Sequence, residues 1–395
     1  MFSLKQHMRR HAMMIAAVAA TVGFAAASHA ATIWYVDTFG TYDPVTVTDD
    51  VSLNDDVAFG TLTLNDGGYT VTGNGHTITL AGGNPYVTSS GTNTLNAIVH
   101  ADIGGGSPMQ WNVTGNLTVD QIGVGYYGSF EKNGNGILRV GNLNASAGIF
   151  VNGGTLILTG QSGTGYNQWG GGGGDRQGSS LIVYSGSTLA GNNIIGVQSI
   201  VQIDGHLAPG ADGEGSGWFQ NKNGTFGSIG KLTIQGADNN SGVTYFNFNS
   251  TSNLDLDLLD GDNYDSLAFL SGRDMSTYGI FLDIYEGAQV NINDLSNGGD
   301  LAGTYHIITL GGNHACTIDY YDTNGDIVDN LPDDFSVFST GVVPPGYHYE
   351  FVRVTDISGN FTGIDLVITH VPEPASLGLL GLGSGLLLLR RKRHA

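Results

Sequence analysis

The sequence predicts an all-β protein whose body is a glycine-rich parallel β-solenoid with a C-terminal β cap. First, 58 of the 63 glycines lie between residues 31 and 371, and glycine destabilises a helix by about 1 kcal/mol relative to alanine. Second, short segments such as Leu254–Leu258 alternate apolar and polar residues with period two. Third, turns rich in Gly and Asn, such as Asn65–Gly68, separate these segments. Together these patterns favour short strands joined by tight turns.

The leader, residues 1–30, has the three parts of a secretory signal peptide. A cationic start is followed by the apolar stretch Met13–Ala27, and small residues, Ser28 and Ala30, occupy the two positions that signal peptidase reads. The cations are Lys5, Arg9 and Arg10. We therefore expect signal peptidase to cleave after Ala30. The alternative is a retained N-terminal anchor.

Residues 31–236 are expected to form the rungs of the solenoid. From Val45 to Leu158, strands recur at intervals of roughly eight to twelve residues, which fits either a β-sandwich or the coils of a solenoid. Internal similarity favours the solenoid, because Gly136–Gly141 and Gly153–Gly160 have the form of successive rungs. A single rung cannot bury its apolar face alone, so such repeats stack on one another.

Three further glycine-bounded segments carry a family resemblance: Ser185–Gly191, Gly205–Gly210 and Ile229–Gly236. They resemble the passenger domains of autotransporters, and this resemblance implies a right-handed, β-helix-like solenoid. Those passengers usually have only a short connection between Pro-Gly and the next strand, whereas the whole stretch 211–228 intervenes here. We therefore expect a protruding loop, and the register of the rungs at this point stays open.

Residues 237–370 are expected to close the stack as a β cap. The strands become longer, and aromatic residues such as Phe246 and Tyr349 offer larger side chains to bury. A cap protects the hydrogen-bonding edge of the last rung from pairing with other molecules. The expected strands are Leu254–Leu258, Ile280–Ile284, His306–Leu310, Tyr347–Val354 and Ile364–Thr369.

The body combines a large negative charge with a single cysteine. Seven of the 14 Lys and Arg lie in the leader and the tail, so residues 31–371 hold seven cations against 34 acids, a formal net charge of −27. Such a surface repels nucleic acid and anionic membranes and suits divalent cations. Solubility outside the cell is by itself a sufficient reason for most of these acids. Cys316 allows no intramolecular disulfide, and we expect it to be an inert, buried residue rather than a nucleophile.

The acidic doublets of the body do not have the spacing of a catalytic pair. Adjacent residues of a strand point to opposite faces, whereas a glycosidase needs two carboxylates about 5–10 Å apart across one sugar. The doublets are Asp49-Asp50, Asp55-Asp56 and Asp333-Asp334. We therefore expect no enzymatic activity, and a β-helical polysaccharide lyase or hydrolase is one alternative. A glycan-binding adhesin is the other, in which Trp169 and Trp218 stack on sugar rings.

One acidic segment has the ligand spacing of a calcium loop. Its oxygen-bearing residues fall at positions 1, 3, 5, 9 and 12 of the loop pattern, and they are Asp322, Asn324, Asp326, Asn330 and Asp333. Ile327 stands where the sharp turn of such a loop requires glycine, and Pro332 interrupts the segment. We favour a hairpin turn at Asn324-Gly325, with weak calcium binding as the alternative. No other cofactor is expected.

The C-terminal residues combine the motif Pro372-Glu373-Pro374, the apolar run Ala375–Leu389 and a basic cluster formed by Arg390, Arg391, Lys392 and Arg393. At about 1.5 Å per residue, the apolar run makes a helix of roughly 22 Å, shorter than a hydrocarbon core of about 30 Å. The basic cluster stops translocation and stays in the cytoplasm, so the body lies outside. A buried or amphipathic helix is the alternative, but the run is apolar on all sides.

Residues 371–395 resemble the PEP-CTERM sorting signal of exported bacterial proteins. The resemblance implies a Gram-negative source and an exosortase, a membrane cysteine protease, that recognises Pro372, Glu373 and Pro374 and processes the tail. We therefore expect an exported, non-enzymatic protein of the cell surface or extracellular matrix, associated with exopolysaccharide or biofilm. Its expected partners are the exosortase, signal peptidase and exopolysaccharide, without nucleic acid. Its contact with the inner membrane is expected to be transient, through residues 375–389.

Overall fold

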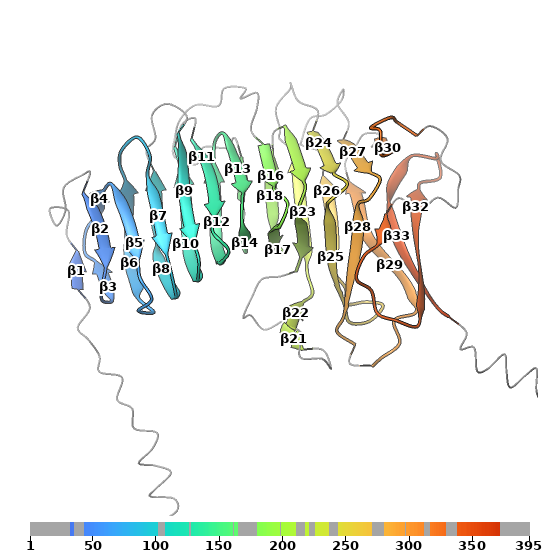
Figure 1. The fold of residues 1–395 in the computed structure, drawn as a ribbon, viewed down its shortest axis with the longest axis horizontal. Coiled ribbons are helices and arrows are strands. Elements are labelled where there is room, and N and C mark those ends of the chain that lie inside the picture. Colours follow the sequence, from blue (N-terminus) through green and yellow to red (C-terminus); the bar gives the residue numbers. More distant parts are fainter. Residues whose placement is uncertain are drawn as a thin grey trace, which may run out of the picture.

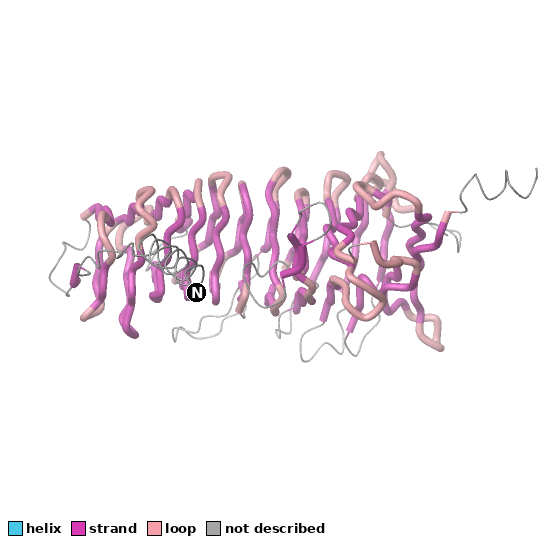
Figure 2. Tube along the Cα trace, turned by 90° about the horizontal axis from the view of Figure 1, so that it is seen from below, coloured by secondary structure: helices cyan, strands magenta, loops and turns pink. Residues whose placement is uncertain are grey.

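The computed structural model shows an all-β chain, and no helix occurs among the residues that it describes. The all-β prediction is therefore confirmed for this part of the chain. Figure 1 shows the strands side by side along the longest axis of the molecule, and Figure 2 shows the same succession from below. The described residues are 32–34, 43–101, 107–125, 128–160, 162–164, 180–197, 199–210, 218–220, 226–236, 244–270, 280–296, 298–311, 317–328 and 338–371.

Parallel strands form three ladders. Ladder 1 is a separate sheet of 11 strands, and ladders 2 and 3 belong to one sheet of 20 strands. The strands of ladder 1 are β2 Pro44–Val47, β5 Thr61–Leu64, β7 Tyr86–Ser89, β9 Pro108–Val113, β11 Ser129–Asn133, β13 Gly148–Val151, β16 Ser180–Val183, β19 Ile200–Ile203, β24 Thr244–Phe248, β27 Ile280–Tyr285 and β30 Thr317–Tyr321.

Ladders 2 and 3 share four long strands, whose first halves pair in ladder 2 and whose second halves pair in ladder 3. Ladder 2 contains β1 Thr32–Trp34, β3 Val51–Leu53, β6 Thr70–Leu80, β8 Thr92–Ala101, β10 Asn116–Val124, β12 Ile137–Ala145, β14 Gly154–Leu158, β17 Ser187–Gly191, β20 His206–Pro209, β25 Asn253–Leu258, β28 Gln289–Asp294 and β31 Ser339–Thr340. Ladder 3 contains β4 Val57–Phe59, the second halves of β6, β8, β10 and β12, and then β15 Ser162–Thr164, β18 Ile194–Val197, β23 Lys231–Gly236, β26 Ser266–Leu270 and β29 Gly303–Gly311.

Each turn of the chain passes through ladders 1, 2 and 3 in that order, and we call such a turn a rung. The predicted rungs at Gly136–Gly141 and Gly153–Gly160 are paired in the structure, with Ile137 opposite Thr155 and Val140 opposite Leu158. The preceding strands of the same two rungs pair in ladder 1, where Phe130 lies opposite Ile149. Whole rungs therefore stack in register, as the internal similarity predicts.

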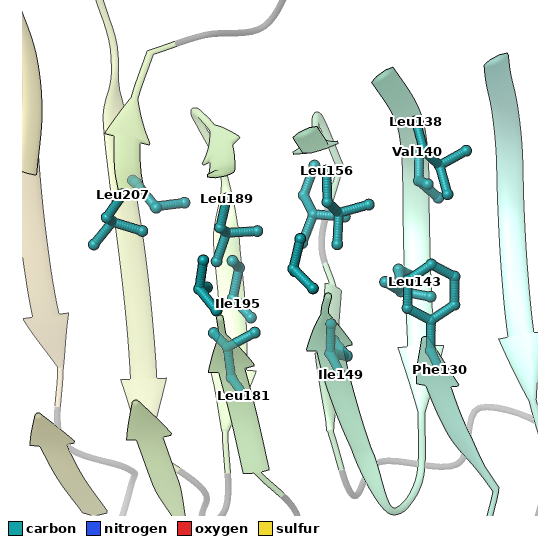
Figure 3. Packing of buried hydrophobic residues seen from close by; sticks show 14 of the residues in the cluster. Phe130, Leu138, Val140, Leu143, Ile149, Leu156, Leu181, Leu189, Ile195 and Leu207 are labelled. Atoms are coloured by element: carbon teal, nitrogen blue, oxygen red, sulfur yellow. The ribbon is translucent and has the colours of Figure 1, made fainter. Parts of the chain in front are cut away.

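Columns of apolar side chains fill the space that the ladders enclose. In ladder 2, register places Leu138, Leu156, Leu189 and Leu207 in one column, and all four are fully buried. Figure 3 shows this column beside Phe130, Ile149 and Leu181 of ladder 1. Complete burial of such a side chain contributes about 1.5–3 kcal/mol, so the columns are the main source of cohesion between rungs.

Four corner glycines, Gly91, Gly115, Gly136 and Gly154, lie where the chain passes from ladder 1 to ladder 2. A Cβ atom on Gly115 would lie 2.0 Å from the carbonyl oxygen of Gly91, and one on Gly136 would lie 2.1 Å from that of Gly115. The same oxygens accept the N–H groups of Asn116 and Ile137. Successive rungs therefore approach so closely at this corner that a side chain does not fit.

An insertion separates Gly205–Gly210 from Ile229–Gly236, at the point where the sequence leaves the register of the rungs open. The Gly205–Gly210 segment pairs with β17 in ladder 2, whereas Ile229–Gly236 pairs with β18 in ladder 3. The described part of the insertion is an antiparallel pair, β21 Trp218–Gln220 and β22 Phe226–Ser228. This pair lies beside the main stack in Figure 1, in agreement with the expected protruding loop.

Parallel pairing continues beyond Gly236, through β24, β27 and β30 of ladder 1. At the far end the pairing of the main sheet becomes antiparallel, where β29 pairs with β33 Phe361–His370 and β33 pairs with β32 Tyr347–Thr355. After residue 236 the strands are spaced more widely along the sequence because the connections between them lengthen. The ladders themselves do not change there. We call β32 and β33 the cap hairpin.

Candidate functional site

The cap hairpin holds the residues that directly precede the predicted sorting motif. His370 ends β33, and its Nε2 lies 3.0 Å from Asp300 Oδ2. The His370 ring stacks on Tyr347 with 5.2 Å between ring centroids, and the N–H of Val371 donates to the carbonyl of Gly346 over 3.0 Å. These contacts fix the chain to the fold at the residue next to Pro372. Sequence analysis did not identify them, because the partners are distant from His370 and Val371 along the chain.

The predicted processing residues themselves lie outside the described residues. They are Ala30 in the leader, Pro372, Glu373 and Pro374 in the motif, and Arg390, Arg391, Lys392 and Arg393 in the basic cluster. The apolar run 375–389 also lies outside. Within the described ranges, no helix has the length and apolar character needed to cross a membrane.

The described part of the predicted calcium loop is a tight turn. Gly325 has a φ of 81°, and Gly325 N–H donates to the carbonyl of Asp322. The Asp322 carboxylate accepts the N–H groups of Asn324 and Asp326, and these bonds, with that of Asp326 the largest, lower the pKa of Asp322. The turn expected at Asn324-Gly325 is present. Asn330 and Asp333 lie outside the described residues, so calcium binding by this loop stays a prediction.

Backbone donors satisfy two of the acids in the N-terminal doublets. Asp50 Oδ1 accepts the N–H of Thr70 over 2.9 Å, and Asp56 Oδ1 accepts the N–H of Thr77 over 2.8 Å. These carboxylates tie one rung to the next rather than facing a common substrate position. Asp334, Cys316 and Trp169 lie outside the described residues, and only the backbone of Trp218 is described.

A third group of polar residues, which sequence analysis missed, lies on the outer surface of ladder 1. Asn247 on β24, Asp283 on β27 and Asp319 on β30 are direct register partners, and we call them the outer row. Their neighbours in sequence alternate into the core, as the buried Leu282 and Ile284 show. The outer row therefore faces away from the apolar interior.

Stacked aromatic rings flank the outer row on both sides. Tyr245 stacks on Phe281 with a centroid distance of 5.4 Å, and Tyr285 stacks on Tyr321 at 4.6 Å with only 13° between the ring planes. These neighbours leave Asp283 only 7% exposed. Burial, together with the negative charge of Asp319, raises the pKa of Asp283 to about 6. The sequence signal is an aspartate followed two positions later by a tyrosine, which recurs in β27 and β30.

The acidic residues of β25 are paired with an amide or an imidazole. His206 Nδ1 lies 2.7 Å from Asp255 Oδ2, Asn291 Nδ2 donates to Asp255 Oδ1, and Asn293 Nδ2 donates to Asp257 Oδ1. Asp265 is buried and accepts the N–H groups of Gly230 and Asp257. Burial, followed by the Asp257 charge, raises its pKa well above the ordinary value. In the described ranges, no three His, Cys, Asp or Glu side chains are grouped to hold a metal ion.

Comparison with known proteins identifies the tail. Residues 370–393 match the PEP-CTERM protein-sorting motif, so the resemblance of the tail to this family is confirmed. The match begins at His370, the last residue of β33, and covers a small part of the chain. No curated protein matches the chain. The motif implies export, location at the envelope or surface, and processing by an exosortase.

Proposed function

We propose that this protein is exported, sorted by its PEP-CTERM tail, and then serves as a non-enzymatic structural component of the cell surface or extracellular matrix. The observation that carries the proposal is the sorting motif at residues 370–393, which starts at the last strand of the fold. Because His370 and Val371 are bound to the cap hairpin and to Asp300, little chain separates the folded body from Pro372. An exosortase that acts at this motif would leave the folded body intact.

The body suits a scaffold. We infer that the three ladders form one right-handed β-solenoid, a description supported by parallel pairing in each ladder. Stacked rungs give a long molecule with a repetitive surface, as Figure 2 shows. The formal charge of −27 between residues 31 and 371 keeps such a molecule soluble outside the cell. Exopolysaccharide remains the proposed matrix partner.

Two other functions make different predictions. A polysaccharide lyase or hydrolase of this shape would generate unsaturated or reducing ends from an added polysaccharide, and the proposed structural protein would generate neither. A glycan-binding adhesin that uses Trp169 or Trp218 would lose glycan retention when either residue is changed to alanine. Assays of product formation and of glycan retention on the purified full chain therefore separate the three functions.

The sorting step is tested by Glu373→Ala in the producing cells. The apolar run 375–389 is shorter than the hydrocarbon core, which suits a transient stop better than a permanent anchor. The variant should be exported but remain membrane-bound at full length, whereas wild-type protein should reach the surface without its tail. Glu350→Ala is the matched control, since Glu350 is an exposed glutamate of β32 and should not affect processing.

Intact-mass measurement of the surface protein decides the outcome. Wild-type protein that still carries Arg390–Ala395 at the surface would contradict processing and leave a stable anchor as the function of the tail. Equal processing of wild type and Glu373→Ala would contradict recognition through Glu373.

A further inference from the structure

The outer row consists only of oxygen-bearing side chains that lie on three adjacent strands. Register pairs Asn247 with Asp283 and Asp283 with Asp319, so each side chain is displaced from the next by one strand spacing, about 4.8 Å. Two carboxylates at this spacing can both reach one ion at the distances of about 2.3–2.6 Å that calcium prefers.

Polar atoms of the outer row lack partners among the described residues. The Oδ1 atom of Asn247 is buried and has no hydrogen-bond partner. Asp283 is only 7% exposed, and no described donor bonds to its carboxylate. All four ion pairs among the described residues join a histidine to an aspartate, and none includes Asp283 or Asp319. An uncompensated buried carboxylate beside a second one is unfavourable, and a bound cation would compensate both charges.

A similar arrangement on ladder 2 shows how the same residue types pair through hydrogen bonds. There, Asn291 Nδ2 donates to Asp255 Oδ1 over 2.6 Å, and Asn293 Nδ2 donates to Asp257 Oδ1 over 2.7 Å. Each amide hydrogen compensates one carboxylate. In the outer row no described bond joins the amide of Asn247 to Asp283, and the register neighbour of Asp283 on its other side is a second carboxylate, Asp319.

The surroundings strengthen the attraction of a cation to the row. The Tyr245–Phe281 and Tyr285–Tyr321 pairs stand on either side of the carboxylates and limit access of water. Electrostatic interactions are stronger in such a partly dry environment than in bulk water.

We propose that Asn247, Asp283 and Asp319 form a calcium site on the outer surface of ladder 1. One amide oxygen and two carboxylates supply the protein ligands, and water completes the roughly six to eight oxygens that calcium takes. The described ranges contain no group of three His, Cys, Asp or Glu side chains that could hold a metal ion. The proposed site is consistent with this, because only two of its three ligands are acids. The site is separate from the Asp322 turn, where backbone N–H groups already satisfy the carboxylate.

The site is tested by thermal unfolding and calorimetric titration of the purified full chain with CaCl₂, after removal of calcium by a chelator. Calcium at saturating concentration should raise the Tm of wild type by about 3 °C or more. Asp283→Asn keeps the shape and removes the charge; it should raise the Tm of the calcium-free protein and weaken calcium binding at least about tenfold. Asp322→Asn is the matched control and should keep the wild-type affinity.

A second variant separates calcium binding from a simple hydrogen bond. If the amide of Asn247 is turned so that Nδ2 donates to Asp283, Asn247→Asp would replace that bond by a third carboxylate and give no gain in calcium affinity. A calcium site should instead bind the ion more tightly in Asn247→Asp. The proposal is overturned by an unchanged wild-type Tm, by an equal calcium shift in Asp283→Asn, by loss of the shift in Asp322→Asn, or by no gain in Asn247→Asp.

Discussion

The rungs at the two ends of the stack use different lengths of chain for the same packing. In the amino-terminal rungs, which span 43–164, Lys132 of β11 pairs with Val151 of β13. In the carboxy-terminal rungs, which span 244–340, Asp283 of β27 pairs with Asp319 of β30, and the separation along the chain is nearly twice as large. The ladder 1 strands keep similar lengths at both ends, so the additional chain lies mainly in the connections.

The two groups of rungs also offer different examples of contact between rungs. The amino-terminal rungs meet through the corner glycines, where the backbone of one rung lies directly on the next. The carboxy-terminal rungs are joined by polar side chains, such as Asn291 to Asp255 and Asn293 to Asp257. The amino-terminal example is a close backbone approach at a corner, whereas the carboxy-terminal example is a set of side-chain hydrogen bonds within ladder 2. The outer row lies in these longer rungs, so the candidate ligand site is found where each rung uses more of the chain.

The largest expected effect is that of Gly115→Ala in the amino-terminal rungs. A Cβ at this position would lie 2.0 Å from the carbonyl oxygen of Gly91, which is backbone and cannot move without shifting a rung. We expect a loss of about 2–4 kcal/mol in the free energy of unfolding, measured by chemical denaturation. Gly83→Ala is the control, because nothing lies within 4 Å of its added Cβ, and it should stay within about 0.5 kcal/mol of wild type. Equal stability of the two variants would contradict the steric role of the corner.

Much of the amino-terminal fold is predictable from sequence because its information is local. Period-two alternation identifies strands, and the repeat of Gly136–Gly141 in Gly153–Gly160 identifies stacked rungs whose register the structure confirms. The placement of Ile229–Gly236 in ladder 3 was not predictable, because the intervening loop hides how far the chain has travelled around the rung. The outer row was also missed, because its residues are far apart in the sequence and their proximity is evident only when the register is known.

Lys132 is a side-chain link within the amino-terminal rungs, and its replacement gives the second largest effect. Its side chain is fully buried, and Nζ donates to the carbonyls of Asn133, Gly134 and Gly153. Lys132→Met should cost about 2 kcal/mol, because these carbonyls lose their donor. The loss is measured by chemical denaturation. If it exceeded that of Gly115→Ala, side chains would contribute more than backbone contacts to the free energy of unfolding at this end.

The same lysine predicts a dependence on pH. Burial lowers the pKa of Lys132 from 10.5 to about 8. Between these values the unfolded chain binds more protons than the folded chain, so the free energy of unfolding should rise as pH increases from about 8 to 10.5. Lys132→Met should lack this rise, and an identical pH profile for the two proteins would contradict the assignment.

Asn291→Ala tests the side-chain links of the carboxy-terminal rungs. The variant loses the donor to Asp255 and also the oxygen that accepts the N–H of Val342. A loss of about 1–2 kcal/mol is expected in the free energy of unfolding. Asn96→Ala is the matched control, since Asn96 is an exposed residue of β8, and its effect should be below about 0.5 kcal/mol. A larger loss in the control would remove the distinction between the two ends.

The smallest expected effect concerns His206, which joins the carboxy-terminal polar network through Asp255. The hydrogen bond to Asp255, with its charge, raises the pKa of His206 above the ordinary 6.5. A raised pKa means that the folded chain holds the proton more tightly, so the stabilisation is complete below the unfolded pKa and is lost as pH rises through the folded pKa. Both side chains are about one-third exposed, which limits the contribution to less than about 1 kcal/mol.

Asp255→Asn removes the charge that contributes to the shift, so it should flatten the fall in stability above pH 6.5 in chemical denaturation. If wild type and Asp255→Asn fell equally over this range, the network would hold the rungs by neutral hydrogen bonds alone.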